Sequence, residues 1–86
     1  MKMKRIPTRV RLPFGFDVRV RQVSKRECQE AVGCDALAGW VASDRTVYLI
    51  RSRPIRLKRA DLAHELQHVM TDYLHALVTM GLARHD

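Results

Sequence analysis

The sequence has no apolar run long enough to cross a bilayer. Spanning a membrane takes roughly 20 consecutive apolar residues, and no such run occurs among these 86 residues. The first five residues, Met1 to Arg5, include three basic side chains and lead into Ile6-Pro7-Thr8 rather than into an apolar signal segment. We therefore expect a cytoplasmic protein with no membrane partner.

Cysteines and aromatic residues are also few. The two cysteines, Cys28 and Cys34, are separated by five residues, which is not the C-x-x-C spacing of a zinc knuckle or a redox site. Without a secretion signal, we expect free thiols rather than a local disulfide. Aromatic residues make up 6% of the chain and no nucleic-acid-reading motif occurs, so base-specific recognition lacks support.

The composition is that of one small folded domain covering residues 1–86. Hydrophobic residues are 47% of the chain and charged residues 29%, a balance typical of globular proteins. The net charge of +7 is large for this length. It favours contact with nucleic acid or an acidic protein, and it is equally compatible with a soluble, self-repelling surface.

Two segments near the amino terminus alternate with the period of a β-strand. They are 8–12, T-R-V-R-L, and 16–23, F-D-V-R-V-R-Q-V. Their apolar residues should face the core and their arginines the solvent. The core positions are Val10, Leu12, Phe16, Val18 and Val20, and the outer positions are Arg9, Arg11, Arg19 and Arg21. Pro13-Phe14-Gly15 supplies turn residues, so the two segments form either a hairpin or one bent strand.

The middle of the chain predicts a short helical turn and a second hairpin. Ser24 and Glu27 are spaced as a capping box, and Gly33 would end the turn. Two apolar segments, 39–42 and 46–50, flank Ser43-Asp44-Arg45, a connection rich in turn formers. We expect an α+β fold, in which a small antiparallel or mixed sheet of three to four strands packs against a long C-terminal helix.

From about Leu57 to Met80 the pattern takes the period of a helix, and Gly81 would end it. At about 100° per residue, the helix has one apolar and one polar side. The apolar side comprises Leu62, Leu66, Val69, Met70, Tyr73, Leu77 and Met80. The polar side comprises Asp61, His64, Glu65, His68, Asp72, His75 and Thr79.

The polar side contains the motif H-E-x-x-H at residues 64–68. Residues four apart on a helix point the same way, so His64 and His68 can bind one Zn²⁺ ion. Glu65 would lie beside the metal, where it can take a proton from a bound water as general base. The alternative is an ordinary solvated helix face. The presence of all four histidines in the last 23 residues favours a metal site.

The sequence leaves the identity of the third metal ligand open. On a straight helix Asp72 lies about 12 Å and His75 about 16 Å along the axis from His64, too far for one ion. A kink near Thr71-Asp72 would make Asp72 a direct ligand, ahead of His75. Without a kink, Asp72 is better placed to accept the other N–H of His68. His85, Asp86 or a group from outside the chain would then complete the site.

The basic strands, the hairpin G-W-V-A-S-D-R-T-V-Y-L-I and the run L-A-H-E-L-Q-H-V-M-T-D-Y-L-H resemble a minimal zincin metallopeptidase domain. More narrowly, the chain is similar to small phage- and prophage-associated members of the ImmA/IrrE-like group. The resemblance implies a zinc-dependent peptidase acting on a peptide or protein, with His64 and His68 as ligands and Glu65 as base. It also implies that a peptide pairs with the hairpin edge near Trp40, Val47 and Leu49. The gluzincin branch usually supplies a glutamate as third ligand, and no glutamate follows Glu65 here.

A basic run lies where the long helix begins, comprising Arg51, Arg53, Arg56, Lys58 and Arg59. Cations at a helix N-terminus oppose the helix dipole, so the run does not serve helix stability. It predicts a surface for an acidic protein or for nonspecific nucleic acid. The rival to a peptidase is thus a small basic nucleic-acid-associated protein whose metal site is structural or vestigial. A third hypothesis is an interaction module using the apolar helix side.

Overall fold

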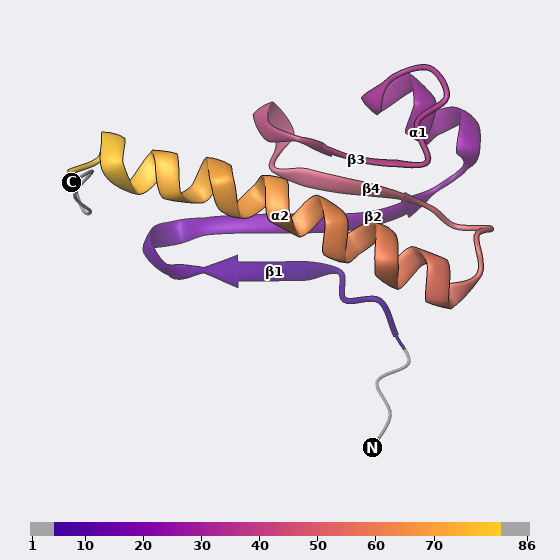
Figure 1. The fold of residues 1–86 in the computed structure, drawn as a ribbon, viewed down its shortest axis with the longest axis horizontal. Helices are drawn as coiled ribbons and strands as arrows, with labels where there is room; N and C mark the ends of the chain where they lie inside the picture. Colours follow the sequence, from indigo (N-terminus) through magenta and orange to yellow (C-terminus); the bar gives the residue numbers. More distant parts are fainter. Residues whose placement is uncertain (1–4, 82–86) are drawn as a thin grey trace.

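The computed structural model describes residues 5–81, which form a four-stranded sheet and two α-helices. The elements follow in the order β1 (Arg9–Leu12), β2 (Phe16–Val23), α1 (Lys25–Val32), β3 (Ala38–Val41), β4 (Thr46–Ile50) and α2 (Ile55–Thr79). In space the strands lie in the order β1-β2-β4-β3, and α2 crosses the sheet (Figure 1). This confirms the predicted α+β fold with its long C-terminal helix.

Both pairs of short strands are antiparallel hairpins. Strand β1 pairs with β2 so that Leu12 lies opposite Phe16, which shows that the first two segments form a hairpin rather than one bent strand. Phe14 and Gly15 both take positive φ in the connection, 67° and 76°. Strand β3 pairs with β4 as predicted. Strands β2 and β4 are parallel, and α1 and β3 form the connection between them in the chain. The sheet is therefore mixed.

The alternation of side chains divides the core between the two faces of the sheet. On one face, residues of β2 and β4 pack under α2: Phe16, Val18, Val20, Val47 and Leu49 meet Leu62, Val69 and Tyr73. On the other face, Val23, Tyr48 and Ile50 pack around Cys28 of α1. Strand β4 is buried on both faces and forms the centre of the molecule.

Helix α1 is a full eight-residue helix rather than a single turn. The Ser24 hydroxyl accepts a hydrogen bond from the backbone N–H of Glu27 at 3.1 Å, as the capping pattern predicted. The helix ends at Gly33. Its last residue, Val32, lies directly against Gly39 of β3, where any side chain larger than hydrogen would collide with it. A glycine inside a strand often marks such a close approach.

Helix α2 is held at its start by an ion pair and ends where predicted. Arg53 donates to both carboxylate oxygens of Asp61, at 2.7 and 3.2 Å. After Thr79, Gly81 takes a φ of 77°. The 25 residues span about 37 Å, more than the roughly 26 Å of the longest strand, β2. The structure describes no helix in residues 5–81 that is apolar enough over sufficient length to cross a membrane.

The buried stripe on α2 is narrower than predicted. Met70 and Met80, expected on the core side, are 40% and 57% exposed. Leu74 is also exposed. The buried positions are Leu62, Glu65, Val69 and Tyr73, spaced by three, four and four residues as on a single helix face. The prediction that Glu65 lies on the polar side of the helix was therefore wrong, because this residue shares the buried face with Leu62 and Val69.

Candidate metal and catalytic site on α2

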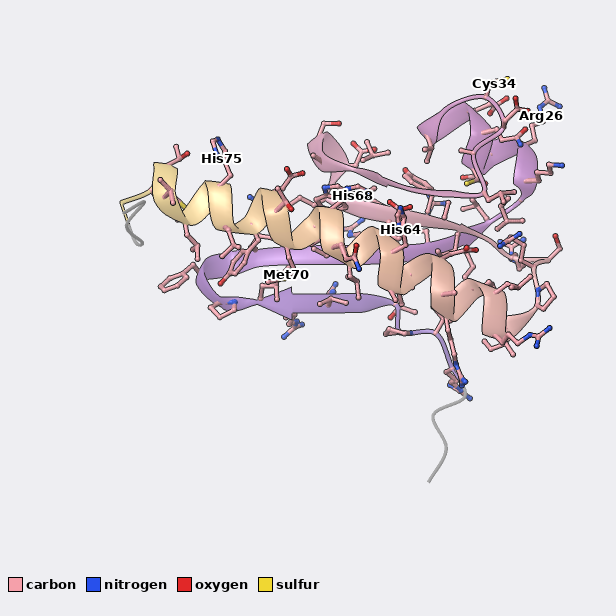
Figure 2. All side chains as sticks on the ribbon, in the orientation of Figure 1. Arg26, Cys34, His64, His68, Met70 and His75 are labelled. Atoms are coloured by element: carbon pink, nitrogen blue, oxygen red, sulfur yellow. The ribbon has the colours of Figure 1, made fainter. Side chains whose placement is uncertain are left out.

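The two histidines of the motif stand one helical turn apart and are exposed. The ring centres of His64 and His68 are 5.1 Å apart, and the rings are nearly perpendicular, at 82°. Figure 2 shows both on the same side of α2, with Met70 on the opposite side. Two imidazoles on one tetrahedral zinc ion, each with a Zn–N bond of about 2 Å, would have ring centres about 5 Å apart. The observed spacing fits a shared ion.

Glu65 lies between the histidines and the core. It is 8% exposed, because it stands about 60° around the helix from Leu62 and about 100° from His64. Within the described part of the chain its carboxylate has no hydrogen bond or ion pair. The carboxylate oxygens are not sealed from solvent, since no buried side-chain oxygen or nitrogen among residues 5–81 lacks a hydrogen-bond partner. No contact with another described side chain occupies this carboxylate, so it can act on a ligand in the neighbouring pocket.

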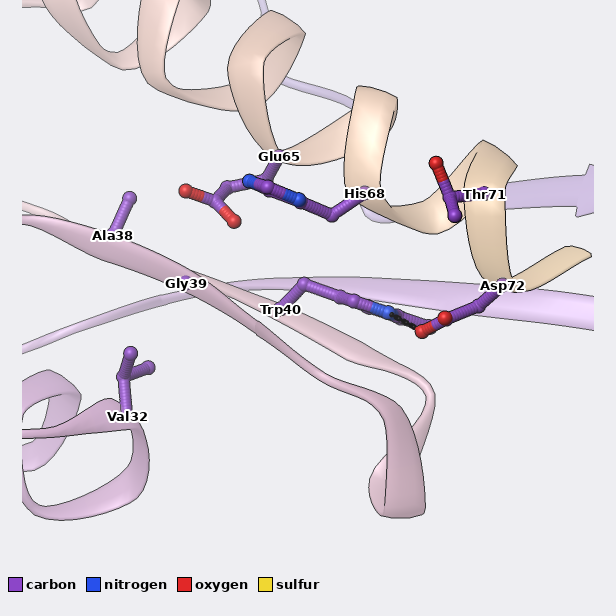
Figure 3. A pocket seen from close by; sticks show the side chains of 8 residues that line it. All are labelled: Val32, Ala38, Gly39, Trp40, Glu65, His68, Thr71 and Asp72. Carbon is purple, nitrogen blue, oxygen red and sulfur yellow. Dashed lines mark hydrogen bonds between the residues drawn. The ribbon is translucent and has the colours of Figure 1, made fainter.

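A pocket of about 430 Å³ opens beside Glu65, between α2 and β3. Figure 3 shows Glu65 and His68 projecting from α2 toward β3, with Trp40 on the opposite wall. The complete lining is Val32, Ala38, Gly39, Trp40, Glu65, His68, Thr71 and Asp72. His64 is not part of this lining. Sequence reasoning missed Val32, Ala38, Gly39 and Thr71. Of these, only Gly39 carried a signal, as a glycine inside a strand segment.

Two carboxylates in the first half of α2, those of Asp61 and Glu65, act on the Cys28 thiol through their charge. The pKa of the Cys28 thiol is raised above its ordinary value of 9.0, first by burial and then by the charges of Asp61 and Glu65. Asp61 is neutralised by Arg53, with both side chains about one-fifth exposed. No cationic side chain among residues 5–81 pairs with Glu65, so its carboxylate lines the pocket without a counter-charge.

Asp72 is held by Trp40 rather than by His68. The Trp40 indole Nε1–H donates to Asp72 Oδ2 at 2.6 Å and ties β3 to α2 (Figure 3). Helix α2 is continuous through Thr71 and Asp72, so the kink that would have made Asp72 a direct ligand does not occur. The hydrogen bond predicted from His68 to Asp72 is not made either.

No third ligand joins the two histidines among residues 5–81. No group of three or more histidine, cysteine, aspartate or glutamate side chains in that range is arranged to hold a metal ion. His75 is exposed and lies further along α2 (Figure 2). His85 and Asp86, the other predicted candidates, lie outside the described residues. The donor set is thus two imidazoles with a carboxylate beside them.

Of the three residues predicted to bind substrate, only Trp40 reaches the pocket. Val47 and Leu49 are fully buried in β4, with side chains facing α2, so they cannot contact a peptide. The prediction for these two residues was wrong. Both residues belong to β4, which is a central strand. Strand β3 is one of the two edge strands of the described sheet, and it borders the pocket.

Much of the predicted basic run is engaged in internal contacts. Arg53 binds Asp61, and Lys58 donates to Gln22 Oε1 at 2.6 Å and to the carbonyl of Arg51 at 3.0 Å. Arg51 itself donates to the carbonyl of Gln22 at 2.8 Å. These bonds tie the start of α2 to the sheet. The five residues of the run therefore do not form one free basic surface.

The fold and the site define an α+β domain with an H-E-x-x-H helix laid across a four-stranded sheet. Comparison of the chain with protein-family models, with curated proteins and with solved structures finds no match. The resemblance to zincin metallopeptidases therefore rests on the motif and on the order of elements alone.

Proposed function

We propose that this chain is a zinc-dependent metallopeptidase-like protein of the cytoplasm, which hydrolyses a peptide bond at the pocket between α2 and β3. The observation that carries the proposal is the state of Glu65. The Glu65 side chain is largely buried, has no hydrogen-bond or ion-pair partner among the described residues, and lines a pocket beside two exposed imidazoles. A carboxylate at the wall of a pocket with no partner to occupy it can take a proton from a water as general base.

In this proposal His64 and His68 hold Zn²⁺ through one ring nitrogen each. When bound, the ion supplies Lewis acidity and lowers the pKa of a coordinated water toward about 7. Glu65 takes a proton from the attacking water as its oxygen bonds to the carbonyl carbon. Glu65 then passes that proton to the departing amine nitrogen as the C–N bond breaks. The products are a carboxylic acid and an amine, so atoms and charge balance.

The edge of β3 gives the substrate a place to bind. The outer edge of an edge strand presents backbone N–H and C=O groups that can pair with an extended peptide. Strand β3 borders the pocket through Ala38, Gly39 and Trp40. A peptide added there would pass in front of Glu65 and His68, and Trp40 would offer an aromatic wall to its side chains.

Metal binding is tested with tag-free protein. Zn²⁺ binding is measured by isothermal titration calorimetry on wild type, His64→Ala, His68→Ala and the control His75→Ala. His75 is exposed on the same helix, seven residues beyond His68, so its variant matches the chemistry of the change. We expect one site in wild type and in His75→Ala, and none in the other two. Equal binding by all four proteins, or no binding by wild type, refutes the metal site.

Catalysis is tested with Glu65→Gln. We expect this variant to bind Zn²⁺ like wild type and to cleave a fluorescence-quenched peptide library about 10²–10⁴-fold more slowly, the usual contribution of a general base. Its thermal stability should be close to that of wild type, because the change keeps the size and shape of the side chain and breaks no hydrogen bond or ion pair among the described residues. Equal turnover by both proteins removes Glu65 from the mechanism. If wild type binds zinc but cleaves no peptide, the metal site is supported and the peptidase activity is refuted.

A further inference from the structure

The solvent face of β1 and β2 carries a row of positive charge, apart from the pocket between α2 and β3. Four arginines alternate with core residues along these strands and project from the face opposite α2. All four are exposed, and α1 packs mainly over β3 and β4, so it leaves this part of the sheet open. The residues are Arg9, Arg11, Arg19 and Arg21, which we call the arginine face.

Most of this charge is not neutralised within the fold. The side chains of Arg9, Arg11 and Arg19 make no hydrogen bond or ion pair with any other residue in the range 5–81. Arg21 meets Glu27 at 3.2 Å, but both side chains are about half exposed, and such a pair is weak. Asp17, opposite Arg11, is the one acidic residue that β1 and β2 contribute to this face.

The arrangement does not serve the stability of the sheet. Arg9 lies directly opposite Arg19 in the β1–β2 ladder. Like charges in directly opposed positions destabilise an antiparallel pair. The basic run before and within α2 is different, because Arg51, Arg53 and Lys58 are engaged by internal acceptors. On the arginine face, by contrast, only the Arg21 side chain has an acidic partner, Glu27, among the described residues.

We propose that the arginine face binds the phosphates of a nucleic-acid backbone without reading the bases. All four cations are arginines, whose planar guanidinium groups pair with phosphate oxygens in a bidentate manner. They are also regularly spaced. Residues two apart on a strand lie about 7 Å apart, and directly opposed residues about 5 Å apart. A regular row of cations suits the repeating charge of a nucleic-acid backbone better than the irregular surface of an acidic protein.

A hollow lies in the part of this surface around Arg9, Arg19 and Arg21. It has a volume of about 500 Å³, and Thr8 and Val20 complete its lining. Aromatic side chains are scarce here: Tyr48 lies under the Arg21 guanidinium, with the ring centre 5.7 Å away. Without a row of aromatic rings for stacking bases, the surface offers contacts to phosphate rather than to bases.

The test is binding of a fluorescein-labelled 20-base-pair DNA duplex, measured by anisotropy between 50 and 200 mM salt. Three free arginines predict a log–log slope of about −2.7, or about 40-fold weaker binding at the higher salt concentration. The variant Arg9→Gln/Arg11→Gln/Arg19→Gln should bind far more weakly, with a slope less negative by about 2.7. The matched control is Lys25→Gln/Arg26→Gln/Arg56→Gln, which removes three exposed cations elsewhere. It should keep the wild-type slope.

Several results would overturn the proposal. They are absence of duplex binding at 50 mM salt, equal losses in both triple variants, and a salt-independent affinity. Binding of a polyglutamate peptide but not the duplex through the same three arginines would assign the face to an acidic protein instead. The thermal midpoint of the arginine variant should match or exceed that of wild type, since the Arg9–Arg19 repulsion is removed. A fall in midpoint would mean that these arginines support the fold, contrary to the proposal.

Discussion

The close approach of α1 to β3 at Gly39 makes a quantitative prediction about stability. A Cβ atom at Gly39 would lie 2.6 Å from Cγ2 and 2.9 Å from Cβ of Val32, and closer still to its Cγ1. Carbon atoms in contact prefer about 3.5–4.0 Å. Val32 is short and β-branched, so it has no flexible end that can swing away. The Gly39→Ala variant must push α1 outward.

The cost can be estimated from two opposing effects. Overpacking usually destabilises a protein by about 1–3 kcal/mol. Replacing glycine by alanine also restricts the unfolded chain, which stabilises by about 0.4–1 kcal/mol. We expect Gly39→Ala to lower the free energy of unfolding by about 1–2 kcal/mol, or the thermal midpoint by about 4–16 °C for a domain of this size.

A double-mutant cycle with Val32→Ala identifies the cause. Unfolding in urea is followed by circular dichroism for wild type, both single variants and the double variant. Removing both Cγ atoms of Val32 makes room, so Gly39→Ala should cost little or nothing in that background. The coupling free energy should be about 1–2 kcal/mol, in the range typical of touching residues. A coupling near zero, or a Gly39→Ala variant as stable as wild type, would refute the packing argument.

Two further predictions concern charges and thiols. Asp61→Asn should lower the free energy of unfolding by about 1–3 kcal/mol, because it weakens a largely buried pair in which Arg53 makes two hydrogen bonds to Asp61. Glu30→Gln breaks the exposed pair with Arg26 and should lower the free energy of unfolding by less than about 0.5 kcal/mol. Similar losses in urea unfolding would contradict this contrast. In the native protein a thiol reagent should modify Cys34 quickly and Cys28 only on unfolding, because Cys34 is exposed and Cys28 buried; rapid loss of both thiols would contradict it. Since the pKa of Cys28 is raised in the folded state, the unfolded chain ionises first, so stability should fall as the pH rises above 9.0. Urea unfolding between pH 8 and 10 should show that fall in wild type and a smaller one in Cys28→Ala.

The elements of this fold could be read from the sequence because local periodicity reports them directly. The alternation in 16–23 predicted a strand with Phe16, Val18 and Val20 inside, and these residues are buried. The helical period, Ser24 and Gly81 located the helices to within a few residues. The order of the strands in the sheet could not be predicted from local sequence patterns. The parallel pairing of β2 with β4 placed β4 in the centre, and this is why Val47 and Leu49 could not be substrate-binding residues.

For the candidate site, the sequence by itself determined which chemical groups lie one helical turn apart. The period of an α-helix brings His64 and His68 together wherever the helix lies, and their ring centres are 5.1 Å apart. The tertiary structure alone decided what surrounds them. The sheet covers the flank of α2 that includes Glu65, and Trp40 reaches across from β3 to Asp72. Arg53, at the start of α2, pairs with Asp61. These outcomes depend on the packing angle between a helix and a sheet. The side chains of both partners set that angle together, so the local periodicity of either segment does not encode it.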